Sequence, residues 1–123
     1  MIHLDTSVLV DCLTGKRRSE GQLRKFIEDN NRVHITALVL FEWRRGPRLP
    51  QEIEDQEALF PPDQIVSFGP IEAATAADLY SHVKRPRGRE IDLAIAACAI
   101  TQRAKLWTLN PGDFKDIPGL KLV

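Results

Sequence analysis

Short apolar runs alternate with helical segments along this chain, and the alternation limits the folds open to it. Strands are expected at 2–4, 33–35, 65–68, 106–109 and 120–122. Helices are expected at 7–13, 20–30, 37–45, 52–60, 70–80 and 90–100. Strands that are separated by helices pair in parallel, and the helices cover both faces of the sheet. The pattern therefore predicts an α/β domain with a parallel sheet of about five strands.

Length and charge narrow the possibilities further. The 123 residues fit one domain, 1–123, with one core. Lys plus Arg and Asp plus Glu both number 17, so only local clusters of charge can attract nucleic acid or a membrane. No apolar run approaches the ~20 residues that span a bilayer, and the chain starts with a strand instead of a basic segment, so we expect a cytoplasmic protein. Cys12 and Cys98 stand in apolar helical surroundings, which favours buried thiols over a disulfide.

The first strand ends at an acid. Asp5 follows the apolar run 2–4 and is followed by Thr6 and Ser7. In open α/β sheets, ligands bind in the crevice beyond the carboxyl ends of the strands, so Asp5 is a candidate site residue. Helix N-capping is the simpler alternative for a strand-end Asp, and Thr6 or Ser7 could equally cap the helix that follows.

A second acid lies inside a helix. Thr36 is a good N-cap for the segment 37–45, and Gly46 ends it. Glu42 shares one side of this helix with Leu38 and Phe41, so its carboxylate needs a partner there. An ion pair with Arg45 would be the simpler explanation.

The remaining acids come late in the chain. Asp92 sits in the first turn of an almost wholly apolar helix, where it could merely complement the helix dipole. Asn110 and Asp113 follow the strand 106–109, where they could be ordinary turn residues. Carboxylates gathered in one partly buried cleft repel each other unless a cation neutralises them. Oxygen ligands favour Mg²⁺ or Mn²⁺, and the absence of a His or Cys cluster argues against zinc.

The chain resembles the PIN-domain family, and most closely the small toxins of VapBC-type toxin–antitoxin pairs. The resemblance rests on four motifs in the family's order: IHLDTS (2–7), TALVLFE (36–42), DLAIAA (92–97) and TLNPGDF (108–114). It implies a metal-dependent endoribonuclease that a cognate antitoxin inhibits, acting as a homodimer, with Asp5, Glu42 and Asp92 as acidic site residues. Many members place an acid where this chain has Asn110, which leaves Asp113 to serve the fourth position.

A mechanism follows from these residues. Asp5 and Asp92 are expected to hold Mg²⁺ or Mn²⁺, which would activate a water for phosphodiester hydrolysis, with Asp113 contributing through water. Glu42 would orient water or act as a base. Thr6, Thr108 and Asn110 are expected to support the acids.

The basic loop 84–89 leads straight into Asp92. Its arginines, Arg85, Arg87 and Arg89, are therefore candidates to bind RNA phosphates, although a solvated loop is the simpler alternative.

Two rival functions remain open. A phosphatase of the haloacid dehalogenase type also begins with a strand-end Asp, but it needs a second acid where Ser7 stands. A catalytically silent PIN scaffold that binds RNA or protein is compatible with Asn110. The three histidines share no spacing, so we expect core or edge roles for them instead of a general base. Trp43 and Trp107 are expected in the core.

Overall fold

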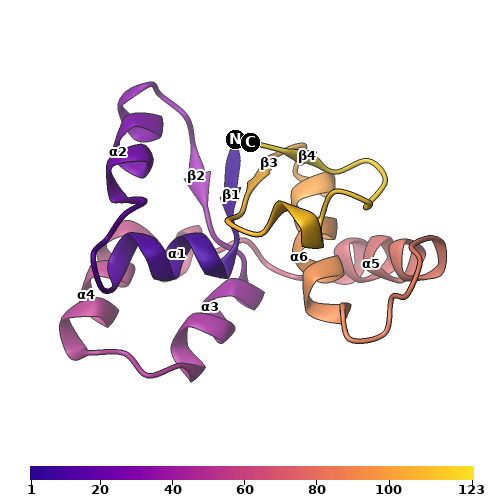
Figure 1. Cartoon of the computed structure of the whole chain (residues 1–123), viewed down its shortest axis with the longest axis horizontal. Helices are drawn as coiled ribbons and strands as arrows, with labels where there is room; N and C mark the ends of the chain where they lie inside the picture. The colour runs from indigo at the N-terminus through magenta and orange to yellow at the C-terminus, as the bar shows by residue number, and fades with distance from the viewer.

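The computed structural model describes residues 1–123, and its centre is a parallel sheet of four strands in the order β2-β1-β3-β4 (Figure 1). The strands are β1 (Ile2–Leu4), β2 (Val33–His34), β3 (Lys105–Trp107) and β4 (Lys121–Leu122). In β1, Ile2 lies opposite Val33 on one side and Lys105 on the other. Because every pair is parallel, the carboxyl ends of the strands share one edge of the sheet.

Six α-helices and two short 3₁₀ helices connect the strands. They are α1 (Thr6–Leu13), α2 (Glu20–Glu28), α3 (Ala37–Arg45), α4 (Pro50–Leu59), η1 (Pro62–Gln64), α5 (Pro70–His82), α6 (Glu90–Thr101) and η2 (Pro111–Asp113). In Figure 1, α1, α2 and α4 lie to the left of β1, whereas α5 and α6 lie to the right. None of these helices has the length and apolar character needed to cross a bilayer.

The central strand is buried on both faces. Side chains alternate between the two faces of a strand, and Ile2, His3 and Leu4 are all buried. Helices therefore cover both faces at β1, as the alternating pattern predicted. The apolar helix α6 is buried from Leu93 to Ala99, also as expected.

The core of the sheet contains an uncharged histidine. Neither ring nitrogen of His3 has a hydrogen-bond partner, and the ring packs edge-on against His34 with 6.3 Å between centroids. Burial, together with the positive charges of His34 and the N-terminus, lowers the pKa of His3 to about 4. His3 is therefore a core histidine.

The predicted strand 65–68 is wrong, so the sheet has four strands instead of about five. The segment makes only an isolated parallel bridge between Val66 and Thr36. Two backbone hydrogen bonds attach it, from Val66 N to Ile35 O and from Ala37 N to Val66 O. No further backbone hydrogen bond joins the segment to residues 33–37, so the bridge does not extend into a ladder.

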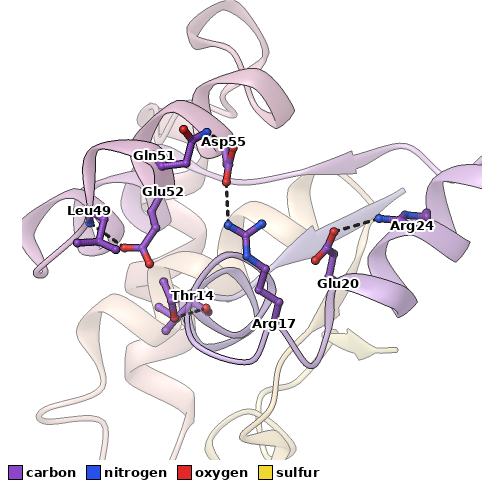
Figure 2. A network of polar contacts seen from close by, with 9 residues as sticks. Thr14, Arg17, Glu20, Arg24, Leu49, Gln51, Glu52 and Asp55 are labelled. Atoms are coloured by element: carbon purple, nitrogen blue, oxygen red, sulfur yellow. Dashed lines mark hydrogen bonds and ion pairs between the residues drawn. The ribbon is translucent and has the colours of Figure 1, made fainter.

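The end of α1 is joined to α4 by polar contacts. Arg17, in the loop after α1, donates to Asp55 on α4 at 2.9 Å (Figure 2). Helix α4 begins before the predicted Glu52, because Pro50 is its first residue and the Glu52 carboxylate accepts from Leu49 N–H at 2.8 Å. A groove of about 350 Å³ lies beside these contacts, lined by residues of α1, α2 and α4.

Both cysteines are buried free thiols, as the sequence predicted. Burial raises the pKa of Cys12 to about 12 and that of Cys98 to about 11. Neither thiol is thus available as a thiolate near neutral pH.

Candidate functional site

Asp5 is held at the carboxyl end of β1 by three hydrogen bonds. The residue is 7% exposed. Oδ1 accepts from the Thr6 backbone N–H at 2.8 Å, and Oδ2 accepts from the hydroxyls of Ser7 at 3.0 Å and Thr108 at 2.8 Å. Asp5 itself is the N-cap of α1, so the predicted capping by Thr6 or Ser7 is wrong. A carboxylate offers about four acceptor positions, so one remains on Oδ1.

The loop after β3 is tied to the same carboxylate. Asn110 N–H donates to Thr108 Oγ1 at 3.0 Å, and Thr108 donates onward to Asp5. Likewise, Leu109 N–H donates to Ser7 Oγ at 3.1 Å, and the Ser7 hydroxyl donates to Asp5. Two pairs of consecutive hydrogen bonds therefore join the segment after β3 to the end of β1.

Glu42 faces the start of α1. Thr6 Oγ1 donates to Glu42 Oε1 at 2.6 Å, and Arg45 donates to Oε2 at 3.4 Å. Phe41, which we expected to share a packed side with Glu42, is 57% exposed, because the buried side of α3 carries Val39 and Trp43 instead. The structure therefore gives Glu42 both the Arg45 partner considered above and a link to the residue after Asp5.

Asp92 is the acid whose charge is least compensated. It lies in the first turn of α6, and no hydrogen bond reaches its carboxylate. Burial, together with the negative charges of Asp5, Asp113 and Glu42, raises its pKa to about 6, although Arg89 opposes the shift. Each of the other three candidate acids therefore lies close enough to Asp92 to disfavour its charged form.

Asp113 and Asn110 occupy the exposed turn after β3. Asp113 ends η2, and its backbone carbonyl accepts from Arg89 at 3.0 Å. The Asn110 side chain makes no hydrogen bond. In the basic loop, Arg85 and Arg87 are exposed and unpaired, whereas Arg89 forms an ion pair with Asp116 at 2.6 Å.

The donor set fits a hard divalent cation by its chemistry. It consists of carboxylate oxygens, and a cation would offset both the burial of Asp92 and the negative charges of Asp5, Asp113 and Glu42, which together raise the pKa of Asp92. No three acidic, histidine or cysteine side chains converge closely enough to form a ready-made metal cage. An ion at this position would depend on water molecules for part of its coordination, as Mg²⁺ commonly does.

Comparison with protein families identifies the family of this chain. The family model of the PIN domain matches residues 2–120. This chain belongs to the PIN domain family. The resemblance noted in the four motifs is thereby confirmed, and the phosphatase alternative falls away. Among curated proteins, none matches this PIN domain.

Solved structures with the same fold cover nearly all of this PIN domain. A toxin–antitoxin complex from Klebsiella pneumoniae is 26% identical, with a TM-score of 0.75 over 98% of this chain and 95% of that chain. VapBC2 from Rickettsia felis, bound to a promoter DNA fragment, is 23% identical, with a TM-score of 0.77 over 100% and 98%. FitAcB from Neisseria gonorrhoeae is 23% identical, with a TM-score of 0.78 over 100% and 97%.

Two features of this PIN domain escaped the sequence reasoning. The sequence gives no sign that the Ser7 hydroxyl bridges Leu109 N–H and the Asp5 carboxylate. The pairing of Arg89 with Asp116 gave no local signal, because 27 residues separate them. By contrast, Trp43 and Trp107 are buried in the core as predicted.

Proposed function

We propose that this PIN domain is a metal-dependent endoribonuclease that hydrolyses phosphodiester bonds in RNA. One observation supports this most strongly. Asp92 has its pKa raised to about 6 by burial and by the charges of Asp5, Asp113 and Glu42. Such crowding is unfavourable in a protein without a ligand, and it suits a site that binds a divalent cation and a phosphate together.

Asp5 and Asp92 would hold Mg²⁺ or Mn²⁺, with Glu42 and Asp113 contributing through water. The cation would supply Lewis-acid activation of a water and neutralise charge on the phosphoryl group. The hydrogen bonds from Ser7 and Thr108 orient the Asp5 carboxylate and leave one acceptor position open. Thr6 fixes Oε1 of Glu42, and Oε2, whose hydrogen bond from Arg45 is long at 3.4 Å, would accept a proton or orient a water.

The first turn of α1 favours an anion. The helix dipole is positive there, and because the Asp5 carboxylate already accepts from the Thr6 N–H, a phosphate would be attracted by the field of the helix. The exposed Arg85 and Arg87 would bind RNA phosphates farther out. The same role was predicted for Arg89, but its guanidinium is already paired with Asp116.

We further propose that this nuclease is the toxin of a type II toxin–antitoxin pair in the cytoplasm. The similar structures include toxin–antitoxin complexes from Klebsiella pneumoniae and Rickettsia felis. Several large apolar side chains are exposed on this chain, which favours surfaces that an antitoxin and a second copy cover. They include Phe41, Leu49, Ile71 and Tyr80.

A silent PIN scaffold that binds RNA or protein is the second candidate. Two observations favour it: Asn110 supplies an amide at the fourth position, and the acids form no ready-made metal cage. The scaffold would bind RNA without cutting it, with or without metal.

A cleavage assay on purified protein separates the two functions. With Mg²⁺ or Mn²⁺ the wild type should cut RNA, and excess EDTA should abolish the activity. Asp5→Asn and Asp92→Asn should each lower the rate by orders of magnitude, because each removes a ligand charge. Asp63→Asn, an exposed acid outside the site, is the matched control and should cut normally. Unchanged cleavage in EDTA would rule out the proposed function.

A further inference from the structure

Arg89 makes four hydrogen bonds through one guanidinium group. Nη1 donates to Asp116 Oδ2 at 2.9 Å and to Lys84 O at 3.2 Å. Nη2 donates to Asp116 Oδ1 at 2.6 Å and to Asp113 O at 3.0 Å. The Arg89 side chain is 21% exposed. This two-pronged pairing with a carboxylate has a defined geometry, which a lysine cannot reproduce.

These bonds join two segments that carry site acids. Arg89 is the N-cap residue of α6 and stands just before Asp92 in the first turn. Asp113 and Asp116 belong to the turn after β3. No other hydrogen bond in the structure joins residues 111–116 to α6 or to the loop 84–89.

The turn needs such a connection. A 3₁₀ segment of three residues has weak internal hydrogen bonding. The Asp113 carboxylate also repels Asp92, as the raised pKa of Asp92 reports. Phe114 anchors the turn in the core, but its side chain does not set the direction of the neighbouring acid.

We propose that Arg89 is a positioning residue that clamps the 111–116 turn against α6 and so keeps the Asp113 carboxylate beside Asp92. The proposal deepens the proposed function, because it rests on these acids binding a divalent cation. It gives Arg89 a role within the protein, separate from RNA binding.

Loss of the positive charge of Arg89 and loss of its two-pronged pairing should change the affinity for a cation in opposite directions. Suitable substitutions can therefore separate the two effects. Arg89 is a positive charge near a cation site, and its removal should tighten cation binding if charge alone matters. If positioning matters, loss of the fork should weaken cation binding even when the charge is kept. Arg89→Lys keeps the charge and loses the fork, while Asp116→Asn removes the partner.

The first measurement is calorimetric titration of Mn²⁺ alone into the wild type, Arg89→Lys and Asp116→Asn. Both variants should bind Mn²⁺ about tenfold more weakly, in line with residues that orient metal ligands. Arg44→Lys is the matched control, since Arg44 pairs with Glu57 at 3.0 Å away from the site, and its affinity should equal that of the wild type. Wild-type affinity in Arg89→Lys, or tighter binding in Arg89→Gln, would overturn the clamp.

The second measurement needs no metal. Amide hydrogen exchange at Phe114 and Lys115, whose N–H groups bond to Pro111 O, should be about tenfold faster in Arg89→Lys and Asp116→Asn than in Arg44→Lys. Equal exchange rates would overturn the clamp whatever the metal result. If the wild type fails to bind Mn²⁺, the proposed function fails, and with it the link from the clamp to the metal site, while the exchange rates still decide whether Arg89 holds the turn.

Discussion

Thr108 Oγ1 donates a hydrogen bond to Asp5 Oδ2 at 2.8 Å, although 103 residues separate them in the chain. The bond joins the carboxyl ends of the two neighbouring strands β1 and β3. It is one of two hydrogen bonds that Oδ2 accepts, the other coming from the Ser7 hydroxyl. It therefore helps to set the direction in which the Asp5 carboxylate points.

Replacing Thr108 by Val should therefore affect both stability and the site. Valine keeps the side-chain shape, but leaves a buried carboxylate with one hydrogen bond fewer. We expect a loss of about 1–2 kcal/mol in the free energy of unfolding, together with weaker Mn²⁺ binding. Urea unfolding and calorimetry measure the two effects. Thr75→Val, which removes a hydroxyl bound only to Ile71 O on α5, is the control, and an equal result for both variants would contradict the assignment.

Thr6 should matter more for activity than for folding. Its hydroxyl donates to Glu42 at 2.6 Å, while its backbone N–H, which binds Asp5, is present in any non-proline variant. Thr6→Val should lower the RNA cleavage rate about tenfold, because Glu42 loses its orienting partner. Thr6→Ser should restore most of the rate. If Thr6→Val cleaves as fast as the wild type, Glu42 needs no such orientation.

Much of the fold follows from local signals in the sequence. The helix 37–45 was predicted with the observed bounds, because Thr36 caps it through Val39 N–H and Gly46 follows it. The strand at 65–68 could not be excluded locally, since apolar β-type residues occur there. Whether such a segment pairs depends on which backbone groups it meets in the folded chain, here only those of Ile35 and Ala37, and the local pattern does not report that.

The sequence indicates the candidate acids, and Thr6 and Thr108 as residues that support them, but not which acid each threonine binds. Asp5, Glu42 and Asp92 stand at strand ends or helix turns that the pattern locates. The partners of these acids are distant in sequence: Thr6 and Glu42 are 36 residues apart, and Arg89 and Asp116 are 27 apart. Such pairings depend on the angles between helices, and the hydrophobic pattern does not encode those angles.

Two groups should give opposite pH dependence to the stability of the metal-free protein. His3 has a native pKa of about 4, below its ordinary 6.5, so the unfolded chain binds more protons than the native protein between these pH values. Stability therefore falls as the pH drops from 6.5 to 4. Asp92 has a native pKa of about 6, above its ordinary 3.8, so the native state binds more protons and stability rises as pH drops from 6 to 3.8. In the wild type the two effects partly cancel.

Asp92→Asn should remove the contribution of Asp92 to the pH dependence of stability and leave that of His3. At pH 7 the variant should be more stable than the metal-free wild type by about 1 kcal/mol, after allowance for the partial solvent exposure of Asp92. The advantage should disappear near pH 4, where the wild-type Asp92 is protonated, and the variant should show the steeper acid loss due to His3. Urea unfolding at a series of pH values in EDTA measures both curves. A constant difference between pH 4 and pH 7 would contradict this.

The fourth position can be tested by adding the missing charge. Asn110 is exposed and offers only a neutral amide, whereas the negative charge of Asp113 is one of those that raise the pKa of Asp92. Asn110→Asp should strengthen Mn²⁺ binding, and Asp113→Asn should cost less RNA cleavage than Asp5→Asn, since Asp113 would act through water. Calorimetry and cleavage rates check the two expectations. Equal Mn²⁺ affinity in the wild type and Asn110→Asp would mean that residue 110 does not face the cation.

The most direct test of a cation-binding acid cluster is the pKa of Asp92 itself, measured by NMR of the side-chain carboxyl carbon with and without Mg²⁺. In the metal-free protein the carboxyl should titrate at about 6, because burial and the other acids disfavour its charge. With saturating Mg²⁺ its pKa should fall below the ordinary value of 3.8, because the cation stabilises the carboxylate. An Asp92 pKa that is the same with and without Mg²⁺ would contradict the account.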